Sequence, residues 1–117
     1  SQSLGNQFYC MLGTAETFLE YIKTGIWPKW KCSIQNYIGA NRTDFIRAMQ
    51  KADKDLKHYL AEVNLPEITS GGKTHLQIYL VLVEHESHHQ GQIINFIFAH
   101  TLPIPQSWTN KWAIKHE

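Results

Sequence analysis

The strongest constraint on the fold is an apolar segment, residues 76–98, that contains no proline and is long enough for several helical turns. Within it, His85 and His89 are four residues apart, so a helix would place both imidazoles on one face, about one turn apart. Large apolar residues share that face, which predicts that the two rings point into the protein. The other members of this face are Ile78, Leu82, Gln92, Ile93 and Phe96. His88 falls on a different face of the same helix.

Two neutral imidazoles on a buried face need hydrogen-bond partners or a shared cation once they leave water. A single buried histidine is usually a hydrogen-bonded core residue, whereas a pair at this spacing among apolar residues favours a metal site. We therefore expect His85 and His89 to bind a divalent metal. Glu86 and Gln92 are candidates for proton transfer or for positioning, and the alternative for both is an ordinary polar place on the helix surface.

The segment from His85 to His89 also satisfies the H-E-x-x-H pattern of zinc peptidases, in which Glu86 would be the general base. No third ligand follows at the spacing of those enzymes, and Glu117 is the only acidic residue further along the chain. No convincing strand precedes the helix to hold a peptide substrate. A zinc peptidase is therefore the weakest of the functional hypotheses.

Two more amphipathic helices are predicted from apolar residues at three- and four-residue steps, over residues 4–24 and about 43–63, and the third helix runs over about 74–100. Ser3 and Gly25 are the expected ends of the first helix, and Asn41 or Thr43 caps the second. The stripe expected to be buried in the first helix is Leu4, Phe8, Met11, Leu12, Ala15, Phe18, Leu19 and Ile22.

Cys10 lies off that stripe, on a polar line with Gln7, Thr14, Thr17 and Tyr21, which favours an exposed thiol or a place on the wall of a cleft. The aromatic connection over residues 25–40 is expected to cover the end of the core with Trp27 and Trp30. Two further expectations concern the third helix and the tail. Gly91 should face a closely packed neighbouring helix, and Trp108 and Trp112 should pack the tail on the body.

Composition narrows the class of protein. At this length we expect one domain, residues 1–117. The net charge is +1 and no basic block stands out, so nucleic-acid binding has no electrostatic support. The apolar runs are too short to cross a membrane. No signal peptide is recognised at the start, so a cytoplasmic protein with reduced Cys10 and Cys32 is expected.

Three helices of this length predict an all-α fold with an incompletely closed core, because a fourth helix closes such a bundle better. The fourth helix would come from residues outside this chain or from a second copy of it.

The segment over residues 84–93, EHESHHQGQI, resembles the H-x-x-x-H-[RQ]-G-Q segment of the DinB/YfiT-like superfamily. Residues 102–105 with the tryptophans that follow, and the opening over residues 3–10, resemble the same family, so the likeness covers nearly the whole chain. The resemblance implies an up-down four-helix bundle, often a homodimer. The family's first helix has no counterpart here and is expected to be missing or supplied from outside this chain.

The resemblance also implies a divalent metal, zinc or nickel, held by three histidines. Two of them carry over to His85 and His89, while the first falls on Cys10, which departs from the family pattern. A thiolate is a good zinc ligand, so Cys10 either completes a Cys-His-His site with an open fourth position or marks a degraded site.

Characterised members of the superfamily are thiol-dependent transferases or isomerases and metal-dependent hydrolases. The resemblance thus implies a metal-dependent thiol S-transferase or hydrolase that acts on a small molecule, with a low-molecular-weight thiol as a candidate partner. The alternative is a non-catalytic, stress-associated bundle in which the histidine pair is vestigial or structural.

Overall fold

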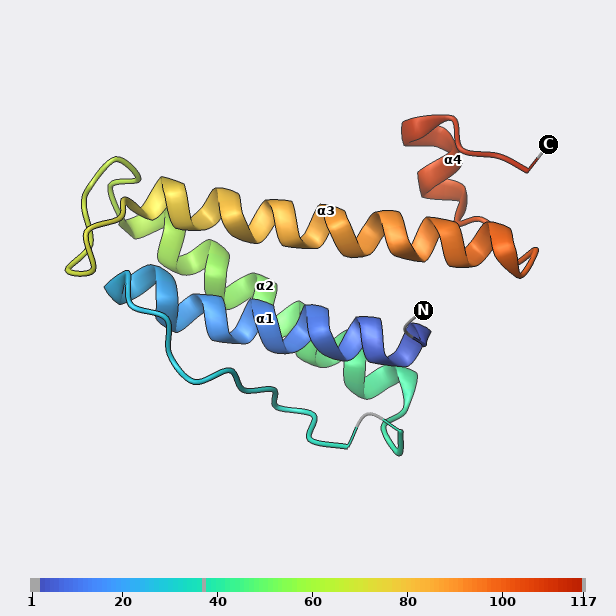
Figure 1. Ribbon diagram of the computed structural model, residues 1–117, viewed down its shortest axis with the longest axis horizontal. Coiled ribbons are helices and arrows are strands. Elements are labelled where there is room, and N and C mark those ends of the chain that lie inside the picture. Colours follow the sequence, from blue (N-terminus) through green and yellow to red (C-terminus); the bar gives the residue numbers. More distant parts are fainter. Residues whose placement is uncertain (1–2, 37, 117) are drawn as a thin grey trace.

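The computed structural model describes residues 3–36 and 38–116, and within these ranges the chain is helical with no strand, as predicted. The elements in chain order are α1 (Leu4–Thr24), α2 (Arg42–Glu62), α3 (His75–Ala99) and α4 (Gln106–Trp112). Both α2 and α3 pack against α1, while the short α4 follows the C-terminal end of α3 (Figure 1). None of the helices in the described ranges has the length and apolar character needed to cross a membrane.

The helix ends follow the predicted signals closely. Ser3 and Asn41 are the N-caps of α1 and α2, and each side chain accepts a hydrogen bond from a backbone N–H of the first turn. Gly25 ends α1 in the left-handed conformation, with φ of 74°, which glycine adopts without strain. Thr74 and Gln77 form a capping box that starts α3.

The core lies between α1 and α3, with α2 along one side. Its buried cluster consists of Phe18, Tyr21, Ile22, Ile78 and Leu82, and the half-buried side chains packed against it are Leu56, Tyr59, Leu60 and Tyr79. Ala52 is the one residue of α2 that is buried, so this helix is covered on one side only.

A trough therefore remains open between α2 and α3, with α1 as its floor. The α2–α3 trough has a volume of about 520 Å³. Its lining residues are Leu12, Ala15, Ile46, Met49, Gln50, Ala52, Asp53, Leu56, Tyr79, Leu82, Val83, Glu86, Ser87 and Gln90.

The polar line of α1 is buried, which corrects part of the predicted orientation of this helix. Thr14 and Thr17 are buried, because the connection after α1 runs back along them (Figure 1). The Thr17 hydroxyl donates to the Gly13 carbonyl at 2.7 Å and accepts from the Lys31 N–H at 3.0 Å. The Trp30 indole N–H donates to the Thr14 hydroxyl at 3.3 Å. The backbone and ring of the connection thus provide the partners that these inward polar groups need.

At Gly13 of α1, a neighbouring side chain leaves no room for any residue larger than glycine. A Cβ atom at Gly13 would lie 2.1 Å from Cζ2 of Trp30, so the indole packs directly on the helix backbone. Gly91, by contrast, has nothing within 4 Å of the corresponding position, and the expectation that it faces a neighbouring helix is wrong.

These two glycines make a matched pair for a stability test. We expect Gly13→Ala to lower the free energy of unfolding by about 1–3 kcal/mol, because the Trp30 ring must move. Gly91→Ala should instead raise it by up to about 1 kcal/mol through higher helix propensity. Urea unfolding of both variants checks this, and a neutral Gly13→Ala would show that the indole contact is dispensable.

The tryptophans differ in what their rings contact. Trp27 is 48% exposed, but its ring lies against Phe18 and Tyr21, with both centroids 5.2 Å away, so it covers the core with part of its surface. Trp108 and Trp112 contact each other in α4, and Trp112 is 42% exposed. The tail tryptophans therefore do not both pack on the body as predicted.

Candidate metal centre

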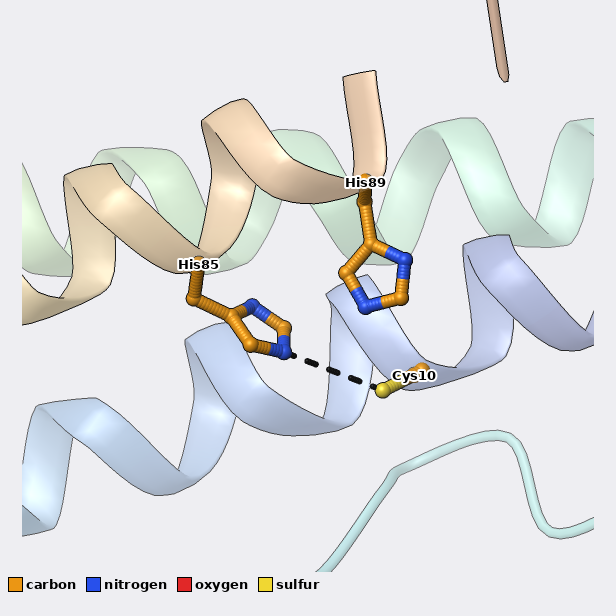
Figure 2. Close-up of side chains that lie close together, drawn as sticks. All are labelled: Cys10, His85 and His89. Carbon is orange, nitrogen blue, oxygen red and sulfur yellow. Dashed lines mark hydrogen bonds between the residues drawn. The ribbon is translucent and has the colours of Figure 1, made fainter. Parts of the chain in front are cut away.

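The packing of α1 on α3 brings together Cys10, His85 and His89. The Cys10 Sγ lies 3.8 Å from the His85 Nε2. One donor atom from each of the three residues lies within 4.8 Å of the other two. Figure 2 shows the two rings projecting from α3 toward the cysteine on α1. The sequence prediction that both histidines share an inward face is confirmed, and His88 is exposed, as its different face implies.

The separations in this cluster are close to those of zinc ligands. With zinc–sulfur and zinc–nitrogen bonds of about 2.3 and about 2.0 Å, the two ligand atoms of a tetrahedral site lie about 3.5 Å apart. The 3.8 Å between Cys10 and His85 approaches this value, and the donor atom of His89 lies within 4.8 Å of both. One thiolate and two imidazoles form a donor set that suits zinc and leaves a fourth position open.

Cys10 is half-buried beside His85, so the prediction of an exposed thiol is wrong. Cys32 lies outside the cluster, with its Sγ 4.0 Å from the Tyr9 carbonyl. Burial raises the pKa of the Cys32 thiol to about 11, so this cysteine stays protonated at neutral pH. Both cysteines are free, as expected for reduced thiols.

His75, another histidine of α3, is a buried structural histidine with a hydrogen-bond partner for each ring nitrogen. His75 is 6% exposed, and its Nδ1 lies 3.2 Å from the Glu67 carbonyl. That nitrogen carries the proton, so the Nε2 accepts from the Tyr59 hydroxyl at 3.1 Å. His85 and His89 differ, because the Nδ1 of each is buried without a hydrogen-bond partner in the described chain. The pair is thus not held as ordinary hydrogen-bonded core histidines are.

Two glutamines extend the cluster along the helices, and each has a buried amide oxygen with no donor within the described ranges. Gln7 is 3% exposed and lies one turn before Cys10 on the same face of α1. Gln92 lies one turn after His89 and is half-buried. Unpaired buried acceptors of this kind suit a bound water or a ligand with N–H or O–H groups. Gln92 was a sequence candidate, whereas Gln7 was missed although its three-residue spacing from Cys10 was visible.

Glu86, the other polar candidate, is not brought into the cluster. Its half-buried side chain lines the α2–α3 trough, and neither His85 nor His89 belongs to that lining. Burial raises the pKa of the Glu86 carboxyl, and the nearby charge of Asp53 adds to the shift. The geometry therefore lends no support to Glu86 as the general base of an H-E-x-x-H peptidase.

The electrostatics of the histidine pair predict acid sensitivity of the metal-free protein. Burial lowers the pKa of His85 below its usual 6.5, with His89 and His88 adding to the effect. Burial likewise lowers the pKa of His89, with His88 adding to the shift and Gln92 partly opposing it. The folded state thus keeps neutral rings, while the unfolded chain takes up protons as the pH falls through about 6.5. Acidification below that value should therefore favour the unfolded chain.

Urea unfolding of metal-free protein at about pH 7.5 and about pH 5.5 measures this effect, a range that spans the ordinary histidine pKa. The wild type should lose more stability between the two values than a His85→Gln/His89→Gln double variant does. His88→Gln is the control and should retain most of the wild-type dependence, because burial is the main cause of both pKa shifts and the charge of His88 only adds to them. An equal loss in the wild type and the double variant would contradict the assignment.

The fold and the site together define an all-α helical bundle with a Cys-His-His cluster between two of its helices. No protein-family model, curated protein or solved structure matches the chain. Any function assigned to this chain therefore rests on the geometry of Cys10, His85 and His89.

Proposed function

We propose that this chain is a DinB-like metal-dependent enzyme in which Cys10, His85 and His89 bind zinc or nickel. The observation that carries the proposal is the convergence of three metal-ligating atoms, from residues as far apart as Cys10 and His85, within 4.8 Å of one another. The bundle is of the up-down type, and the family's first helix is either missing or supplied from outside residues 1–117. A cysteine in place of the family's first histidine keeps a ligand that zinc accepts.

The reaction that fits such a site is thiol S-transfer or hydrolysis of a small molecule. A divalent cation with one open position lowers the pKa of a water or thiol bound there and so makes a nucleophile at neutral pH. The chain's own contribution would be orientation. The free amide oxygens of Gln7 and Gln92 accept hydrogen bonds from a water or from an N–H group of the substrate.

Elemental analysis of protein purified without a metal-affinity step tests the proposal, beside a Cys10→Ala variant. About one zinc or nickel per chain, lost or weakened in the variant, supports the Cys-His-His site. Metal that stays bound in the variant assigns the third position to another residue. No metal in either protein, even after zinc is added, would rule out the enzyme.

Activity is then screened on the metal-loaded protein. Low-molecular-weight thiols are paired with a chromogenic chlorodinitrobenzene for S-transfer, and nitrophenyl esters report hydrolysis. A rate that falls to the background level in His89→Ala belongs to this site. A rate of S-transfer or hydrolysis that persists in variants without bound metal comes from a contaminant in the sample.

The second candidate, a non-catalytic bundle, is favoured by one feature of the same site. A metal-bound histidine usually donates its other ring N–H to a carboxylate or carbonyl, which fixes its orientation. The Nδ1 atoms of His85 and His89 have no such partner in the described part of the chain. Bound metal without turnover in any of these assays would favour this candidate.

A further inference from the structure

The α2–α3 trough is an apolar surface that the proposed chemistry does not use. Ile46 of α2 and Val83 of α3 line its walls, yet they are 44% and 41% exposed. Leu76 and Leu80 continue the stripe of Val83 along α3 at helical spacing, and both are exposed as well. Apolar residues in a row on two facing helices are typical of a surface that binds a partner.

The trough is also acidic. Asp53 and Glu86 line it, and none of its lining residues is a lysine, arginine or histidine. The Glu86 side chain is half-buried, and its carboxylate has neither a hydrogen bond nor an ion pair with any described residue. Burying a carboxylate in apolar surroundings without a partner is costly, and a cation placed between the two acidic groups would offset this cost.

The length of the trough fits a short helix. Its lining residues run from Ile46 to Leu56 on α2 and from Tyr79 to Gln90 on α3. At a rise of about 1.5 Å per residue these stretches are about 15 and about 16 Å long. Three turns of an α-helix have the same length. A helix laid there would close the three described long helices into a four-helix bundle.

The described chain does not supply this helix itself. The free helix, α4, has seven residues and spans about 10 Å, which is shorter than the trough. Two copies paired symmetrically through their troughs would place two acidic surfaces against each other with no lysine, arginine or histidine in either lining, and this like-charge contact is unfavourable.

We propose that the α2–α3 trough binds an amphipathic α-helix of a separate polypeptide, about three turns long, with a lysine or arginine facing Glu86 and Asp53. Its apolar stripe covers Ile46 and Val83. This inference rests on the proposed bundle architecture and names the place, length and charge of the outside helix. It does not require a metal at the Cys10 cluster.

The test uses a fluorescent, side-chain-stapled peptide of about fourteen residues, because unconstrained helices of this length are marginal in water. The peptide has a leucine stripe and a single central lysine, and a second peptide carries glutamate in its place. Fluorescence anisotropy measures both affinities against wild type, Val83→Asp and Glu86→Gln. Val81→Asp is the matched control, because Val81 is an equally exposed valine about half a turn away on α3.

The lysine peptide should bind wild type about tenfold more tightly than the glutamate peptide, as expected for a charge pair in a partly buried contact. Val83→Asp should weaken it about tenfold or more, Val81→Asp should not, and Glu86→Gln should remove most of the lysine preference. Equal binding of the two peptides, or equal losses at positions 81 and 83, would overturn the proposal.

A protein that forms dimers broken by Val83→Asp, and binds neither peptide, would overturn it in favour of a second copy as the occupant. Circular dichroism confirms that each variant is folded. The zinc content of Val83→Asp shows whether peptide binding and metal binding are independent. We expect Val83→Asp to hold as much zinc as the wild type while it loses peptide binding. If the proposed metal site is wrong, zinc will be low in the wild type and in every variant alike.

Discussion

Zinc affinity is expected to fall about a hundredfold or more in His85→Ala and in His89→Ala, because each removes one of three protein ligands from the proposed site. His88→Ala should leave the affinity nearly intact, since His88 is exposed on another face of α3. Competition titration against a chromophoric zinc chelator measures all three variants. The three histidines share one helical turn, so overall charge and helix stability change similarly in each.

An equal loss in His88→Ala would show that the ligand face has been misassigned. Cys10→Ser belongs in the same series, because a hydroxyl is a much poorer zinc ligand than a thiolate. A loss in Cys10→Ser comparable to that in His85→Ala would assign the third ligand to Cys10. An unchanged zinc affinity in Cys10→Ser would mean that a residue other than Cys10 is the third ligand beside His85 and His89.

Zinc should also stabilise the fold strongly. Saturating zinc raises the free energy of unfolding by about 4 kcal/mol when its free concentration is a thousand times the dissociation constant. For a chain of this size such a gain corresponds to a rise in Tm of about 10 °C or more. Differential scanning calorimetry with zinc and then with excess chelator measures the shift. The His85→Ala variant should show almost none, and an equal shift there would mean that the metal acts elsewhere.

The helices could be predicted from the sequence because their signals are local. Apolar spacing and the predicted caps at Ser3, Gly25 and Asn41 gave boundaries close to those observed, since capping depends on residues only a few positions apart. The orientation of α1 was harder. Thr14 and Thr17 read as a polar line, and only the later connection, with Trp30 and the backbone of Lys31, explains why they are buried.

The candidate site, too, could be predicted from the sequence only where its geometry is local. His85 and His89 are four residues apart on one helix, so their proximity follows from helix geometry alone. Cys10 is far from them in sequence, and its spacing favoured exposure; only the likeness to a family suggested it as a ligand. The placement of Glu86 in a trough with Asp53 depends on how α2 packs, which no local pattern predicts.

The thin covering of α2 has a consequence for how the molecule opens. Only Ala52 of α2 is buried, and its other core contacts come from the half-buried Leu56, Tyr59 and Leu60, so this helix is held by less buried apolar surface than α1 and α3. Its detachment should therefore cost less free energy than global unfolding and occur more often. The Cys10 thiol and the imidazoles of His85 and His89 belong to α1 and α3, which form the better-packed pair. The ligand cluster can therefore stay assembled through partial opening events in which α2 swings away from the rest.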